Sequence, residues 1–155
     1  MRAVQVTQTF PGTVAAAEAR WYDAAAWPAW VDGCDRVLEV AGRWPDAGGS
    51  VTWESGPAGR GHVTERVDTH QPGTGQTVEV TDVSIAGRQT VTFTAASGGV
   101  AVTLRLEYRL LRRSPILPIV DLLFIRRAMA QSLERTVSRF GAGLRVEPDP
   151  PAAAL

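Results

Sequence analysis

The sequence predicts an α+β domain in which a curved antiparallel sheet of about seven strands wraps around one long C-terminal helix. Two observations favour this class. Short segments with apolar residues at alternate positions follow one another and are separated by tight-turn signals, as in antiparallel sheets. The last long segment instead repeats its apolar residues at helical spacing. Each apolar face can leave water only by packing on the other.

The chain begins with one strand and two short helices. Residues 4–10 alternate between apolar and polar, and Pro11-Gly12 ends this strand. The alanine-rich residues 13–23 predict a helix with one apolar face. A second helical piece over 24–31 carries two tryptophans, and Asp32-Gly33 closes it with turn chemistry.

Six more strands are expected in the middle of the chain. Three glycine-containing segments separate several of them and are hairpin signals: Gln71-Pro72-Gly73, Ala86-Gly87 and Ser97-Gly98-Gly99. No helical segment intervenes, which indicates a meander. The expected strands are 36–41, 50–55, 59–68, 76–85, 88–95 and 100–111.

The chain then turns helical. Ser114-Pro115 offers an N-cap followed by proline at the first helical position, and Gly141 and Gly143 offer a C-terminal stop. We therefore expect one domain over residues 1–145 and a flexible tail over 146–155. The apolar stripe of the helix comprises Leu122, Ile125, Met129, Leu133, Val137, Phe140 and Leu144.

Composition and single residues exclude several function classes. Sixteen basic and sixteen acidic residues cancel, so we expect no nucleic-acid partner. Cys34 is the only cysteine and the sequence has no lysine, which excludes an intrachain disulfide, a cysteine-rich metal site and a P-loop lysine. His62, on the polar side of its strand, and His70, in a loop, do not make a metal set. We expect no cofactor, no membrane span and a cytoplasmic location; a homodimer is compatible with the sequence.

Two carboxylates share the apolar side of their strands. Glu65 lies between Val63 and Val67, and Asp82 follows Val78 and Val80. A carboxyl group in an apolar pocket has its charged form disfavoured and can serve as a proton donor. The alternative is that each carboxylate pairs with an arginine or lies at the sheet edge.

Other residues are candidates for holding a ligand. Arg126, beside the stripe of the helix, would clamp an anionic group or else extend into water. Tyr108 would bind a carbonyl or else be a core tyrosine with a satisfied hydroxyl. The full set of predicted pocket residues is Trp27, Trp30, Trp53, Glu65, Val80, Asp82, Phe93, Leu104, Leu106, Tyr108, Arg126 and Met129.

The order of elements, with particular residues in place, resembles the START-like (SRPBCC) superfamily of helix-grip folds, which includes polyketide cyclases, dehydrases and lipid-transport proteins. The residues that carry the resemblance are Asp23, Trp27-Pro28-Ala29-Trp30, Gly49–Trp53, Gly61–Val67 and Leu104–Tyr108. The resemblance implies that a small hydrophobic molecule binds between sheet and helix. It covers residues 3–144 and carries no catalytic signature.

Three hypotheses about function remain open. The first is a module that binds a lipid, polyketide or aromatic metabolite in a cavity of roughly 300–1,000 Å³. The second is a cyclase- or dehydratase-type enzyme that uses a pocket carboxylate as general acid or base. The third is an interaction domain whose own side chains fill the cavity.

Overall fold

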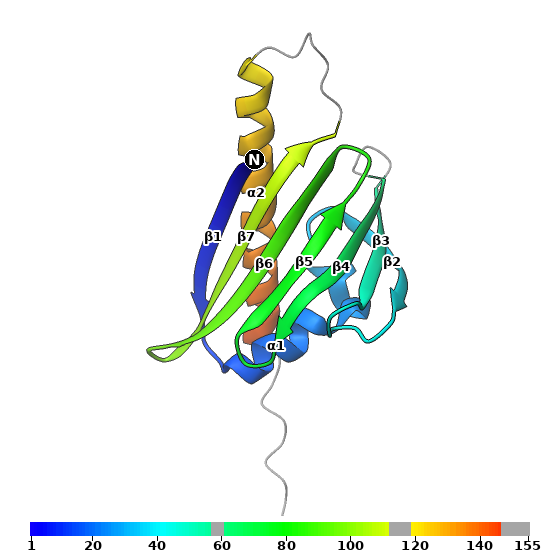
Figure 1. Cartoon of the computed structure of the whole chain (residues 1–155). Helices are drawn as coiled ribbons and strands as arrows, with labels where there is room; N and C mark the ends of the chain where they lie inside the picture. The colour runs from blue at the N-terminus through cyan, green and yellow to red at the C-terminus, as the bar shows by residue number, and fades with distance from the viewer. Residues whose placement is uncertain (57–60, 112–118, 147–155) are drawn as a thin grey trace, which may run out of the picture.

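One antiparallel sheet of seven strands, in the order β1-β7-β6-β5-β4-β3-β2, forms the body of the computed structural model (Figure 1). The structure describes residues 1–56, 61–111 and 119–146, with the side chains of 119–124 and 145–146 left out. The seven-stranded antiparallel sheet and the long C-terminal helix confirm the predicted fold class. The elements are β1 (Arg2–Phe10), α1 (Val14–Tyr22), η1 (Ala24–Ala29), β2 (Cys34–Ala41), β3 (Ser50–Ser55), β4 (His62–Gln71), β5 (Gly75–Thr81), β6 (Ile85–Ala96), β7 (Gly99–Leu110) and α2 (Ile119–Val146).

The strands turn the predicted apolar residues inward. Along β4, residues at alternate positions are buried, and Val63 is fully inaccessible. Val80 on β5 and Leu104 on β7 are at most 3% exposed. Because side chains alternate between the two faces of a strand, these three buried positions show which residues of β4, β5 and β7 face the core.

α1 and η1 bring a cluster of tryptophans under the sheet. The Thr13 hydroxyl caps α1 by accepting a hydrogen bond from the Ala16 amide at 3.1 Å. Trp21 on α1 stacks against Trp30, with ring centroids 4.8 Å apart, and both pack on Phe140 of α2. The two short helices therefore connect the sheet to the long helix.

Helix α2 crosses behind the sheet and packs mainly along β1 (Figure 1). It continues through Gly141 and Gly143 to Val146, so the prediction that these glycines end the helix is wrong. They serve packing instead: a β-carbon would collide with the Phe10 ring at Gly141 and with the Arg20 guanidinium at Gly143. The start predicted at Ser114-Pro115 lies outside the described residues, as does the expected tail beyond Val146.

Two expectations about the strands also need correction. β5 ends at Thr81 and the turn to β6 lies at residues 82–84, whereas Ala86-Gly87 belongs to β6. The reason is that the Asp82 carboxylate accepts hydrogen bonds from the amides of Ser84 and Ile85 at 2.6 and 2.9 Å, which stabilises the earlier turn. His70 lies within β4, not in a loop, and its side chain is 8% exposed.

Candidate functional site

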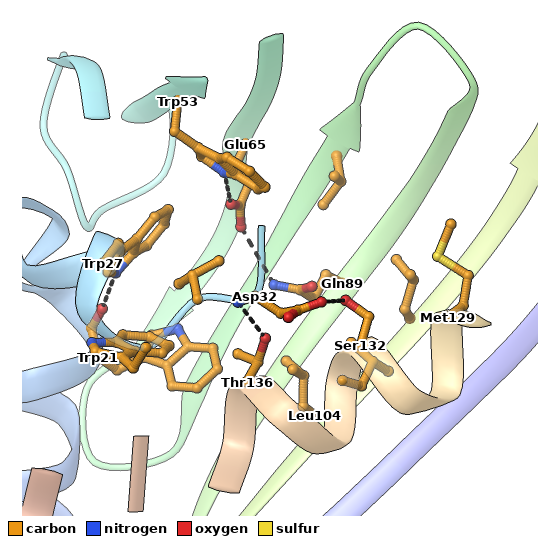
Figure 2. A pocket seen from close by; sticks show the side chains of 15 residues that line it. Trp21, Trp27, Asp32, Trp53, Glu65, Gln89, Leu104, Met129, Ser132 and Thr136 are labelled. Carbon is orange, nitrogen blue, oxygen red and sulfur yellow. Dashed lines mark hydrogen bonds between the residues drawn. The ribbon is translucent and has the colours of Figure 1, made fainter. Parts of the chain in front are cut away.

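A small pocket lies between the inner face of the sheet, η1 and α2 (Figure 2). Its volume is about 50 Å³, room for a few water molecules and below the roughly 300–1,000 Å³ expected for a ligand cavity. The large indole side chains around it account for the small volume. The lining residues are Trp21, Trp27, Trp30, Val31, Asp32, Trp53, Glu65, Val80, Gln89, Leu104, Leu106, Met129, Ser132, Leu133 and Thr136.

Most of the residues proposed from the sequence come together here. They converge from η1, from four strands of the sheet and from the middle of α2. The sheet residues among them were predicted from the alternation along each strand, and Met129 was predicted from the apolar stripe of the helix. The eight predicted residues that line the pocket are Trp27, Trp30, Trp53, Glu65, Val80, Leu104, Leu106 and Met129.

Four of the predicted residues do not line the pocket. Asp82 holds the β5–β6 turn. Phe93 is buried against Trp21, with ring centroids 6.1 Å apart. Arg126 is exposed on α2. Tyr108 is fully buried and its hydroxyl has no hydrogen-bond partner among the described residues.

Glu65 supplies a buried carboxylate to the pocket. It is 6% exposed and lies on β4 opposite Val51 of β3 and Val80 of β5. The indole N–H of Trp53 donates to its Oε2 at 2.7 Å, and the Gln89 amide donates to its Oε1 at 3.4 Å (Figure 2). Trp53 comes from the adjacent strand β3 and Gln89 from β6, two strands away on the other side, so donors on both sides of Glu65 orient its carboxylate.

Cys34 lies near Glu65 but is not suited to act as a nucleophile. The thiol is 8% exposed, and burial, followed by the negative charges of Glu65 and Asp35, raises its pKa to about 11. At neutral pH it is therefore a protonated thiol with little reactivity. Among the described residues, no group of histidine, cysteine and carboxylate side chains could hold a metal ion.

Asp32 joins the corner after η1 to α2 and forms one wall of the pocket. Its carboxylate accepts hydrogen bonds from the Ser132 hydroxyl at 2.8 Å and from the Arg135 guanidinium at 3.0 and 3.1 Å. Its backbone amide donates to the Thr136 hydroxyl at 2.9 Å. Arg139 adds a longer contact at 3.4 Å. We call these interactions the Asp32 latch.

The latch is predicted to depend on pH. Burial alone would raise the pKa of Asp32, but the hydrogen bonds from Arg135 and Ser132, with the charges of Arg135 and Arg139, outweigh it and lower this pKa. A lowered folded-state pKa stabilises the fold above the unfolded-state pKa, about 4, and this stabilisation disappears as the pH falls through the folded-state value. Asp32→Asn should therefore destabilise the domain by about 1–2 kcal/mol at pH 7 and by less at pH 3, which lies below the unfolded-state pKa.

Denaturant unfolding of wild type and Asp32→Asn at both pH values measures this difference. Asp35→Asn is the matched control, because Asp35 is exposed on β2 close by in the sequence, and it should behave like wild type. An equal loss of stability at pH 7 and pH 3 for Asp32→Asn would contradict the latch.

Four of the five polar residues that line the pocket, Asp32, Gln89, Ser132 and Thr136, were not predicted from the sequence. Gln89 could have been found, because it stands two positions before Val91 and four before Phe93 on the inward side of β6. Ser132 and Thr136 lie one helical turn apart beside the apolar stripe, a weaker signal. Asp32 gave only a turn signal, since its partners are about a hundred residues away in the chain.

The sequence and the fold were then compared with known proteins. A family model described as polyketide cyclase / dehydrase and lipid transport matches residues 1–145. No curated protein matches the chain. Among the described residues, no helix is long and apolar enough to span a membrane.

Several solved structures share the fold. A START superfamily protein from Mycobacterium smegmatis superposes with a TM-score of 0.74 at 10% identity over 92% of this chain and 97% of its own. A Rhodobacter sphaeroides protein superposes with a TM-score of 0.68 at 20% identity, over 92% of this chain and 91% of its own. StfQ, a di-domain ARO/CYC protein from the steffimycin biosynthetic pathway, gives 0.70 at 15% identity over 90% of this chain and 49% of its own. On the family match and this fold, the chain belongs to the polyketide cyclase/dehydrase and lipid transport family of START-like, helix-grip proteins.

Proposed function

We propose that this domain binds a small hydrophobic molecule, such as a lipid, polyketide or aromatic metabolite, in the pocket between the sheet and α2. The observation that carries the proposal is the lining: four indoles and six other apolar side chains stand beside five polar residues. Such a composition is typical of sites that gain affinity from apolar burial and orientation from sparse hydrogen bonds. The family description, which includes lipid transport, supports the same class of ligand.

A bound molecule requires the pocket to widen beyond its 50 Å³. Met129 is the lining side chain best suited to change its rotamer and enlarge the pocket. It is unbranched, has three rotatable side-chain bonds and is half-buried on α2. The wall that contains Met129 also contains Ser132 of the Asp32 latch, so widening of the pocket and release of the latch involve the same stretch of helix.

Native mass spectrometry of freshly purified protein, followed by titration with a panel of apolar ligands, tests binding. We expect a co-purified adduct or saturable binding. Met129→Trp should block it by filling the pocket, whereas Gln131→Trp, two residues away on the exposed side of α2, should not. Absence of an adduct together with no saturable ligand in the panel would favour the interaction domain whose own side chains fill the cavity.

Glu65 supports a second candidate, a cyclase- or dehydratase-type reaction. A buried carboxyl group held by Trp53 and Gln89 beside an apolar pocket is placed to give or take a proton. The ARO/CYC designation of StfQ and the family description point to the same chemistry. Glu65→Gln preserves the shape of the side chain and an oxygen acceptor for Trp53, and it should abolish turnover while ligand binding remains. Turnover that survives in Glu65→Gln would rule out this role.

A further inference from the structure

One tryptophan that lines the pocket carries a hydrogen-bond donor that is unpaired among the described residues. Trp30 is 1% exposed and lines the pocket, yet its indole N–H has no hydrogen-bond partner among the described residues. Its ring is fixed by contacts with Trp21, Trp27 and Phe140 at centroid distances of 4.8, 6.2 and 5.1 Å. The ring therefore cannot readily turn to bring its N–H to a distant acceptor.

Three other indole N–H groups of the same region each have a hydrogen-bond acceptor. Trp27 donates to the Trp21 carbonyl oxygen at 2.8 Å, Trp44 to the Tyr22 carbonyl oxygen at 2.8 Å and Trp53 to the Glu65 carboxylate at 2.7 Å. A buried N–H without an acceptor loses its hydrogen bonds to water and gains nothing in return, which is why such groups are rare in native proteins. The Trp30 N–H is such a group among the described residues.

We propose that the ligand of the pocket presents an oxygen acceptor, such as a carbonyl, ether or phenolic oxygen, that accepts a hydrogen bond from the Trp30 N–H. This inference rests on the proposed binding function and narrows its ligand class. An apolar molecule with such an oxygen satisfies the N–H, while a pure hydrocarbon leaves it unpaired. Trp30 comes from the η1 side and Glu65 from the sheet, so polar groups on two walls would set the orientation of the ligand.

A pair of probes of the same shape separates this hydrogen bond from apolar burial. 1-Indanone carries a ring carbonyl, and indane has the same bicyclic frame without it. Their dissociation constants are measured by equilibrium dialysis for wild type, Trp30→Phe and a protein with 3-benzothienyl-alanine at position 30. The last side chain keeps the size of the indole and lacks only the N–H, so it also serves if Trp30→Phe fails to fold.

Loss of the N–H should raise the dissociation constant of 1-indanone roughly 5- to 100-fold and leave that of indane nearly unchanged. The reason is that a buried carbonyl without a hydrogen-bond donor costs free energy. Trp27→Phe is the control: its N–H already bonds to Trp21, so any effect should be equal for both probes. Equal weakening of both probes by the benzothienyl substitution would overturn the inference and leave hydrophobic binding intact. Failure of wild type to bind either probe, together with no co-purified adduct, would overturn both.

Discussion

Phe140→Ala should lower the free energy of unfolding by about 3–5 kcal/mol, the range for removing a buried aromatic ring. Phe140 is fully buried where α2 meets the other layers, with ring centroids 6.5 Å from Phe10, 5.2 Å from Trp21 and 5.1 Å from Trp30. The Arg20 guanidinium covers the same ring at 5.7 Å. Removing the ring leaves a cavity that the three aromatic neighbours, with their rigid rings, cannot close.

Denaturant unfolding followed by circular dichroism measures the loss. Phe140→Leu should cost less, because leucine fills part of the space, and Gln131→Ala on the exposed side of α2 should change stability by less than about 0.5 kcal/mol. A loss below about 1 kcal/mol for Phe140→Ala would show that α2 is not held to the tryptophan cluster as described.

Gly141→Ala should destabilise the domain by about 1–3 kcal/mol, although the same change in an exposed helix stabilises by about 1 kcal/mol. The added methyl group would occupy the position of the Phe10 ring, which is itself 3% exposed and packed in the core, so the ring can yield only by disturbing its buried neighbours. The sign of the effect therefore distinguishes a packing glycine from a glycine that merely weakens the helix.

Gly143→Ala is the matched comparison for this prediction. Its methyl group would meet the Arg20 guanidinium, the end of a flexible and half-buried side chain that can shift. In thermal unfolding, Gly143→Ala should have a higher melting temperature than Gly141→Ala. The opposite ranking, or stabilisation by Gly141→Ala, would contradict the close contact between β1 and α2.

The sequence predicted those features that depend on local periodicity. Val63, Val80 and Leu104 are inward because side chains alternate along any strand, and this alternation can be read without knowing the partner strands. Met129 and Phe140 follow in the same way from helical spacing. Six of the pocket residues, Trp53, Glu65, Val80, Leu104, Leu106 and Met129, were found on this basis.

The features that escaped prediction depend on contacts between distant segments. Gly141 has the signature of a helix stop, but the helix continues past it, and the Phe10 ring packed against this position explains why a residue without a side chain stands there. Asp82 has the parity of a pocket residue, but its bonds to Ser84 and Ile85 place it in a turn. Asp32 becomes part of the pocket wall only when Arg135 and Ser132 are brought beside it.

The position of β1 has a consequence for how the chain reaches this structure. β1 lies at one edge of the described sheet and pairs with β7, with Arg2 opposite Tyr108 and Phe10 opposite Val100. Roughly a hundred residues separate these partners, so the entropy of closing a long loop opposes their pairing and slows folding. Since α2 packs mainly along β1, the surface on which the pocket-covering helix packs is complete only after this long-range pairing has formed.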